Sequence, residues 1–84
     1  MPGPTLSPIE RQRIAAAAKL YAAGVPVRWK AYSLRLWYEA EGKQHKVTSA
    51  PSWRVFTALL KLVQREWDQL TGGMDGNDSS INAA

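Results

Sequence analysis

Residues 52–70, SWRVFTALLKLVQREWDQL, decide how the rest of the chain must be arranged. Large apolar side chains recur there at steps of three and four residues, which places them on one stripe of a helix. The stripe consists of Trp53, Phe56, Leu60, Val63, Trp67 and Leu70, widened by Val55, Leu59 and Leu62. A helix that is apolar over most of its circumference must be covered by other elements. We therefore predict a central buried helix here.

The polar arc that remains on this helix is narrow and basic. It contains Arg54, Lys61 and Arg65 together with neutral side chains and one aspartate. Such an arc is either an ordinary solvated face or a surface that meets phosphate groups. The pattern alone leaves both interpretations open.

Start and stop signals define the limits of two helices. The last helix should begin around Pro51, where Ser49 or Ser52 can cap it, and end near Thr71, because two glycines follow. A first helix should begin after Ser7, because Ser7-Pro8-Ile9-Glu10 contains a capping serine, a proline at the first helical position and the glutamate of a capping box. It should end before Gly24.

The segment between these helices fits two structures. As a helix, residues 27–41 have two opposite apolar faces and would lie between the other two helices. As strands, residues 32–40 alternate apolar and polar side chains, and Glu41-Gly42-Lys43 would turn into a second strand over residues 44–48. We favour the helix because the segment is rich in Leu, Ala, Arg, Lys and Glu. The expected fold is an all-α, three-helix domain; the alternative is α-β-β-α with a hairpin around 32–48.

The length and composition fit a single domain. The 84 residues include four tryptophans and three tyrosines but no cysteine, so the core must hold the fold without disulfides. We expect a flexible N-terminal tail over residues 1–6, one helical domain over 7–71 and a flexible acidic tail over 72–84. No apolar run approaches a membrane span and the N-terminus lacks the order of a signal peptide, so we expect a cytoplasmic protein that makes no membrane contact.

The charge is distributed unevenly along the chain. All eleven Lys and Arg residues lie between Met1 and Arg65, a segment with only three acidic residues, whereas the rest of the chain has four acids and no base. The expected folded domain is thus more basic than the net charge of +4 indicates. A basic domain attracts polyanions, of which nucleic acid is a common example.

Catalytic and metal-binding chemistry is poorly represented in the sequence. His45 is the only histidine and lies between Gln44 and Lys46 in a polar, basic stretch. The usual spacings of metal ligands, a glycine-rich phosphate loop and a nucleophile motif are all missing. We therefore expect no enzyme activity, no catalytic residues, no metal site and no cofactor.

Two stretches of sequence resemble a known type of DNA-binding domain. Residues 20–36, LYAAGVPVRWKAYSLRL, resemble the first two helices of helix-turn-helix domains in bacterial resolvases and transposases, and residues 47–56, VTSAPSWRVF, resemble the start of their recognition helix. The resemblance implies that Ser49, Ser52 and Arg54, at the N-terminal turn of the last helix, approach base edges, and that Lys61 of the same helix also binds DNA. It also implies that four cations bind the backbone of double-stranded DNA: Arg28, Lys30, Lys43 and Lys46.

These observations predict a small, sequence-selective DNA-binding protein that regulates transcription or replication of a bacterial, plasmid or phage genome. The alternative is a small phage-type modulator that inhibits a host protein, an enzyme, through an aromatic and basic surface. Self-association as a homodimer is compatible with DNA binding, because helix-turn-helix proteins frequently bind as two-fold dimers. Loss of DNA affinity with increasing salt would distinguish the two functions.

Overall fold

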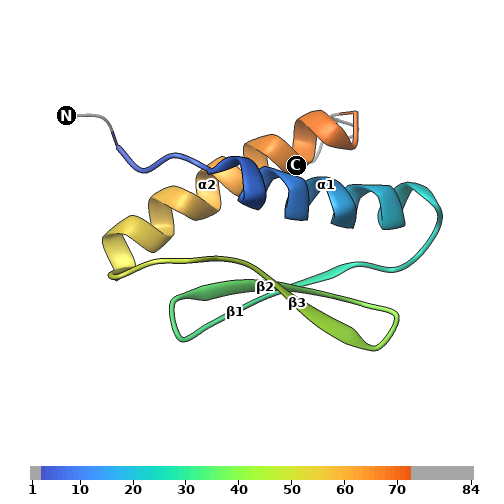
Figure 1. Ribbon diagram of the computed structural model, residues 1–84, viewed down its shortest axis with the longest axis horizontal. Coiled ribbons are helices and arrows are strands. Elements are labelled where there is room, and N and C mark those ends of the chain that lie inside the picture. The colour runs from blue at the N-terminus through green and yellow to red at the C-terminus, as the bar shows by residue number, and fades with distance from the viewer. Residues whose placement is uncertain (1–2, 73–84) are drawn as a thin grey trace, which may run out of the picture.

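Two helices and a three-stranded sheet follow one another in the order α-β-β-β-α in the computed structural model, which describes residues 3–72 (Figure 1). The elements are α1 (Pro8–Ala22), β1 (Arg28–Tyr32), β2 (Arg35–Ala40), β3 (Lys43–Ser49) and α2 (Trp53–Leu70). The strands pair antiparallel in the order β1-β2-β3. The tail expected over residues 72–84 lies, from residue 73 onward, outside the described residues.

The expected start of α1 is confirmed, whereas α2 begins at Trp53, two residues after the expected Pro51. At α1, the backbone N–H of Glu10 donates to Ser7 Oγ at 3.3 Å, and the backbone N–H of Ser7 donates to Glu10 Oε1 at 2.8 Å, which completes a capping box. At α2, Ser52 is the capping residue and accepts from the N–H of Val55 at 3.3 Å. These local contacts fix where each helix begins, and Gly24 follows α1 at a φ of 91°.

The expected all-α, three-helix domain is wrong, because residues 28–49 form three strands. The α-β-β-α alternative is closer, but it omitted β1. In β2, Leu36, Tyr38 and Ala40 are buried while the residues between them are less buried. The alternation of apolar and polar side chains therefore decides the local structure, although the amino-acid composition of the segment favours a helix. Ser33 and Leu34 both have positive φ, and this two-residue turn between β1 and β2 interrupts any helix.

Glu41 and Gly42 form the second two-residue turn, with φ of 56° and 75°, the pattern of a type I′ hairpin. Asn-Gly is the preferred pair at such turns, because asparagine tolerates positive φ better than glutamate does. We expect Glu41→Asn to raise the free energy of unfolding by roughly 0.5 kcal/mol and Gly42→Ala to lower it by about 1–2 kcal/mol. Urea denaturation measures both. Equal stability of the two variants would contradict this turn geometry.

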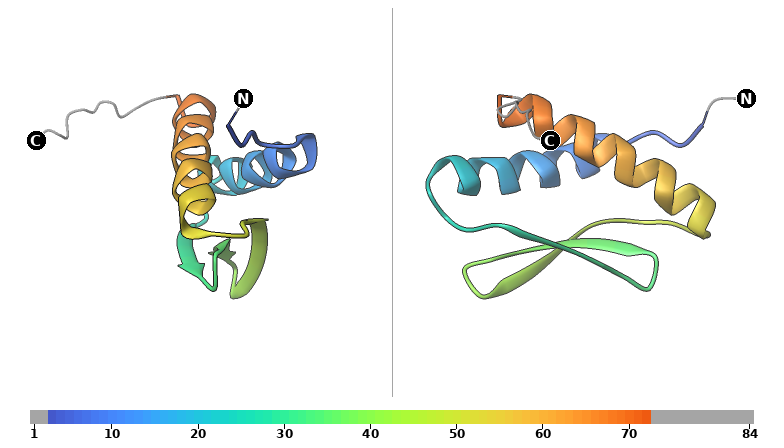
Figure 2. Two further views of the ribbon diagram at one scale, coloured as in Figure 1. Left: turned by 90° about the vertical axis from the view of Figure 1, so that its left-hand side faces the viewer. Right: turned by 180° about the vertical axis from the view of Figure 1, so that it is seen from behind.

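Both helices lie on one face of the sheet, and the core lies between them and the strands (Figures 1 and 2). The largest fully buried side chains are Phe56 of α2, Ile14 of α1, and Val47 and Thr48 of β3. Trp67 of α2 packs edge-on against both Tyr21 and Trp29, at centroid distances of 5.3 Å. Leu6, a residue of the expected N-terminal tail, is also buried in this core.

A β-bulge in β3 places two consecutive side chains in the interior. Leu36 pairs with Thr48 and Trp37 pairs with Lys46, so Val47 is an extra residue. The Thr48 hydroxyl donates to the Glu10 carboxylate, which ties the first turn of α1 to β3. Partial burial of Glu10 opposes its ionisation, but the hydrogen bonds from Thr48 and Ser7 outweigh burial and lower the pKa of the carboxyl group.

Candidate nucleic-acid interface

The face of the sheet that points away from the helices is a continuous polar surface. Strand alternation and pairing place there Arg28, Lys30 and Tyr32 of β1, Arg35, Trp37 and Glu39 of β2, and Gln44, Lys46 and Ser49 of β3. We call this set the outer face. Figure 2 shows edge-on that α1 and α2 both lie on the opposite side. The outer face is therefore left uncovered by the two helices.

Cations dominate the outer face. It carries Arg28, Lys30, Arg35 and Lys46, against the single carboxylate of Glu39. Lys30 Nζ lies 2.7 Å from Glu39 Oε1. The hydrogen bond and positive charge of Lys30, with a smaller contribution from Arg28, lower the pKa of Glu39. The carboxylate thus partly neutralises the β1 side of the face, and the face as a whole stays strongly positive.

Two aromatic rings lie next to each other on the outer face. The rings of Tyr32 and Trp37 are stacked, with centroids 5.5 Å apart and planes inclined by 2°. The Tyr32 hydroxyl donates to Gln44 Oε1 at 3.2 Å, so Tyr32 extends from β1 across β2 to β3. The indole nitrogen of Trp37 is buried and has no hydrogen-bond partner among residues 3–72. The outer face therefore combines cations with a flat, partly apolar aromatic surface.

The structure brings together four of the site residues expected from the sequence and separates the others. Arg28, Lys30, Lys46 and Ser49 share the outer face. Lys43 follows the second turn and pairs with Ala40, a position on the helix side of the sheet. Ser52 caps α2, and Arg54 and Lys61 lie on the exposed side of that helix, so these three residues are not part of the outer face.

The helix-turn-helix arrangement implied by the resemblance is not the fold of this chain. Residues 28–32, expected in a second helix, form β1, and residues 43–49, expected before a recognition helix, form β3. The Ser52 hydroxyl accepts from the N–H of Val55 at the start of α2. Trp53, expected on the buried stripe, is 69% exposed. The recognition-helix interpretation of α2 therefore lacks its structural basis.

Sequence reasoning did not propose Arg35, Tyr32 or Gln44 as site residues. Arg35 and Tyr32 pair directly across β1 and β2, and Gln44 receives the hydrogen bond of Tyr32. The available signal was the alternation of residues 32–40, which places Arg35, Trp37 and Glu39 on one side of a strand. Following the strand interpretation would have placed these three residues on one face of a strand, but its hairpin began at residue 32 and left out Lys30.

No protein-family model, curated protein or solved structure matches this chain. Within residues 3–72, no three His, Cys, Asp or Glu side chains are grouped so that they could hold a metal ion. Neither helix in this part of the chain has the length and apolar character needed to cross a membrane. The outer face is the most distinctive feature on which a functional argument can rest.

Proposed function

We propose that this protein binds double-stranded DNA through the outer face of its sheet. The observation that carries the proposal is an uncovered antiparallel sheet face with four cations around a stacked Tyr32–Trp37 pair. Three strands spaced by roughly 4.8 Å make a backbone about 10 Å across. The major groove of DNA is about 12 Å wide and admits a two-stranded β-ribbon, so two of the three strands can enter it while the third lies beside a phosphate backbone. The width of the sheet and the positive charge of its outer face are therefore both compatible with duplex DNA.

The side chains of the outer face suggest a division of roles. Arg28 and Lys46 lie on the two outer strands, where they can contact the phosphate backbones on either side of a groove. Arg35 lies on the central strand and can donate two hydrogen bonds to a guanine edge. The Tyr32 hydroxyl occupies Gln44 Oε1, which leaves the amide N–H groups of Gln44 free to donate to a base.

Base contacts of this kind give sequence selectivity. We propose that such selectivity serves the regulation of a genome. A small DNA-binding protein acts as a regulator of transcription or replication, here of a bacterial, plasmid or phage genome, in the cytoplasm. This part of the proposal follows from the class of partner and from the small size and basic charge of the chain.

A salt titration of binding to duplex DNA of mixed sequence tests the proposal. If three or four phosphates are neutralised, the association constant should fall log-linearly with salt, by about 40- to 150-fold between roughly 50 and 200 mM. Fluorescence anisotropy of labelled duplex measures the constant. Absence of binding at low salt, or an affinity that does not change with salt, would overturn the proposal.

The same face also supports a second candidate function, inhibition of a host protein. Tyr, Trp and Arg are the residues that most often dominate the energy of protein interfaces, and the outer face combines all three types. A contact that depends mainly on the aromatic pair would be far less sensitive to salt. A flat salt titration together with capture of a host enzyme by the purified protein would favour this alternative.

A further inference from the structure

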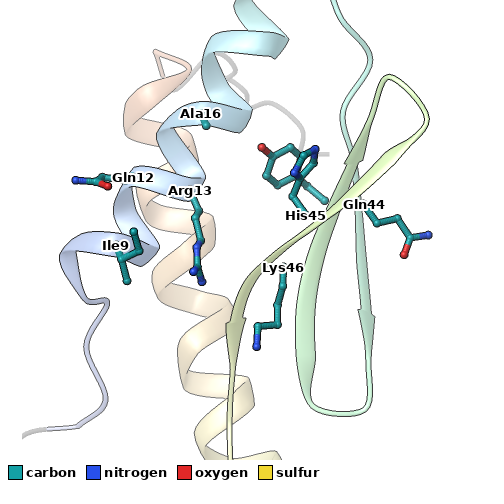
Figure 3. Close-up of a pocket in the computed structure, with 8 residues that line it drawn as sticks. Ile9, Gln12, Arg13, Ala16, Gln44, His45 and Lys46 are labelled. Carbon is teal, nitrogen blue, oxygen red and sulfur yellow. The ribbon is translucent and has the colours of Figure 1, made fainter.

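A second basic feature lies at the edge of the sheet, in a groove between α1 and β3. The groove has a volume of about 450 Å³. Its walls are formed by Ile9, Gln12, Arg13 and Ala16 of α1, by Tyr38 of β2, and by Gln44, His45 and Lys46 of β3. Figure 3 shows that Gln12 points away from β3 and that Gln44 points away from α1. The polar groups left to serve the groove are therefore those of Arg13, Tyr38, His45 and Lys46.

Arg13 is held in place but retains donors for a ligand. Its Nη1 donates to the backbone oxygen of Val47 at 3.3 Å, which fixes the guanidinium group beside the bulge. A guanidinium group has five N–H donors, so most of them remain available. The charge of Arg13 helps to lower the pKa of Glu10. The Glu10 oxygens, however, accept their hydrogen bonds from Ser7 and Thr48, so Glu10 does not occupy the donors of Arg13. Among residues 3–72, no carboxylate lies within 4 Å of a nitrogen of Arg13 or Lys46.

Lys46 and His45 join the groove to the outer face. Lys46 pairs with Trp37 and so belongs to the outer face, yet it also lines the groove, because β3 is an edge strand around which a long side chain can reach. His45 stacks on Tyr38, with centroids 4.7 Å apart, on the helix side of the same strand. Lys46 therefore places one cation at the boundary between the outer face and the groove, and Arg13 adds a second on the α1 side.

We infer that the groove between α1 and β3 binds a phosphate diester of the nucleic acid that lies on the outer face, with Arg13 and Lys46 as the two cations that hold it. This inference rests on the proposed function and deepens it. One DNA backbone crosses the edge of β3, where Lys46 meets it first. Its phosphate then accepts hydrogen bonds from the guanidinium group that Val47 positions. No base is read there, so the contact contributes affinity without sequence selectivity.

The variant Arg13→Gln tests this inference, with Arg11→Gln as its matched control. Both variants remove one exposed arginine of α1, but Arg11 does not line the groove. Losing one phosphate contact should lower the salt slope by about 0.9 and the affinity by about fivefold at 0.15 M salt, relative to the control. Circular dichroism checks that both variants remain folded.

The single histidine provides a second, local measurement. The imidazole proton signals of His45 should shift when duplex DNA is added to the unchanged protein, and this shift should shrink in Arg13→Gln but not in Arg11→Gln. An unchanged salt slope with no shift of His45, in a protein that still binds DNA, would overturn the groove inference and leave the outer face standing. Complete absence of DNA binding would overturn both.

The source of the phosphate is resolved by adding inorganic phosphate alone. We expect it to shift the His45 signals only weakly, because a single phosphate lacks the support of the neighbouring contacts on the outer face. Saturable binding of inorganic phosphate that DNA cannot displace would instead show that the groove binds free phosphate, and the inference about the DNA backbone would be wrong.

Discussion

Phe56→Ala should remove a large part of the folding free energy of this protein. The Phe56 side chain is 1% exposed and lies on the face of α2 that packs into the core with Ile14 and Val47. Truncating a buried phenylalanine costs about 3–5 kcal/mol, because the apolar contact is lost and a cavity remains. A domain of this length has a total stability of only about 4–13 kcal/mol. Urea denaturation followed by circular dichroism should show a large fall in the midpoint.

Trp53→Ala is the matched control for this prediction. Trp53 is 69% exposed, and its ring meets that of Phe56 edge-on at 5.6 Å. Its removal sacrifices one aromatic contact and little buried area, so we expect a loss of about 1 kcal/mol or less. A comparable loss in the two variants would show that the packed face of α2 has been assigned incorrectly.

Neutralising the outer face should nearly abolish DNA binding. The variant carries Arg28→Gln, Lys30→Gln, Arg35→Gln and Lys46→Gln, which removes all four cations of the face. Losing the phosphate contacts of Arg28 and Lys46 and the base contact of Arg35 should lower the affinity at 0.15 M salt by about 10²- to 10³-fold and the salt slope by about 1.8. Fluorescence anisotropy over a range of salt concentrations measures both quantities. Thermal unfolding must show that the variant remains folded, since Glu39 loses its partner Lys30.

Its control removes the same number of charges from the helices. Arg11→Gln, Arg54→Gln, Lys61→Gln and Arg65→Gln all lie at exposed positions of α1 or α2. Because these side chains are outside the outer face, we expect only a several-fold loss of affinity through the reduced long-range attraction. An equal loss in the two variants would mean that net charge alone, or the surface of α2, is responsible for binding.

The helices could be predicted from the sequence because their signals are local. Ser7, Pro8 and Glu10 act within a single turn, and Ser52 does the same at the second helix. The sheet depends on contacts between distant residues. In β1 only Trp29 and Lys30 are half-buried, so this edge strand has no clear alternation to reveal it. The bulge also could not be predicted from the sequence. Val47 and Thr48 are consecutive and both buried, which breaks the alternation of buried and exposed side chains along a strand.

The candidate site was only partly predictable for the same reason. Basic residues could be listed from the sequence, but only strand pairing shows that Lys46 and Trp37 are neighbours or that Tyr32 reaches Gln44. Arg54 and Lys61 were chosen because a helix was expected to enter a groove. Once residues 28–49 are known to form a sheet, the cations of that sheet become the better candidates.

The irregularity at Val47 also makes β3 a poorer template for pairing with a strand of another copy. An edge strand can recruit a strand from another copy through its free carbonyl and amide groups, which leads to aggregation. In β3 the local break in pairing and the capture of the Val47 carbonyl by Arg13 disrupt such a template. At the opposite edge, Arg28 and Lys30 would repel an identical β1. The sheet can therefore keep one face uncovered while both of its edge strands disfavour pairing with further strands.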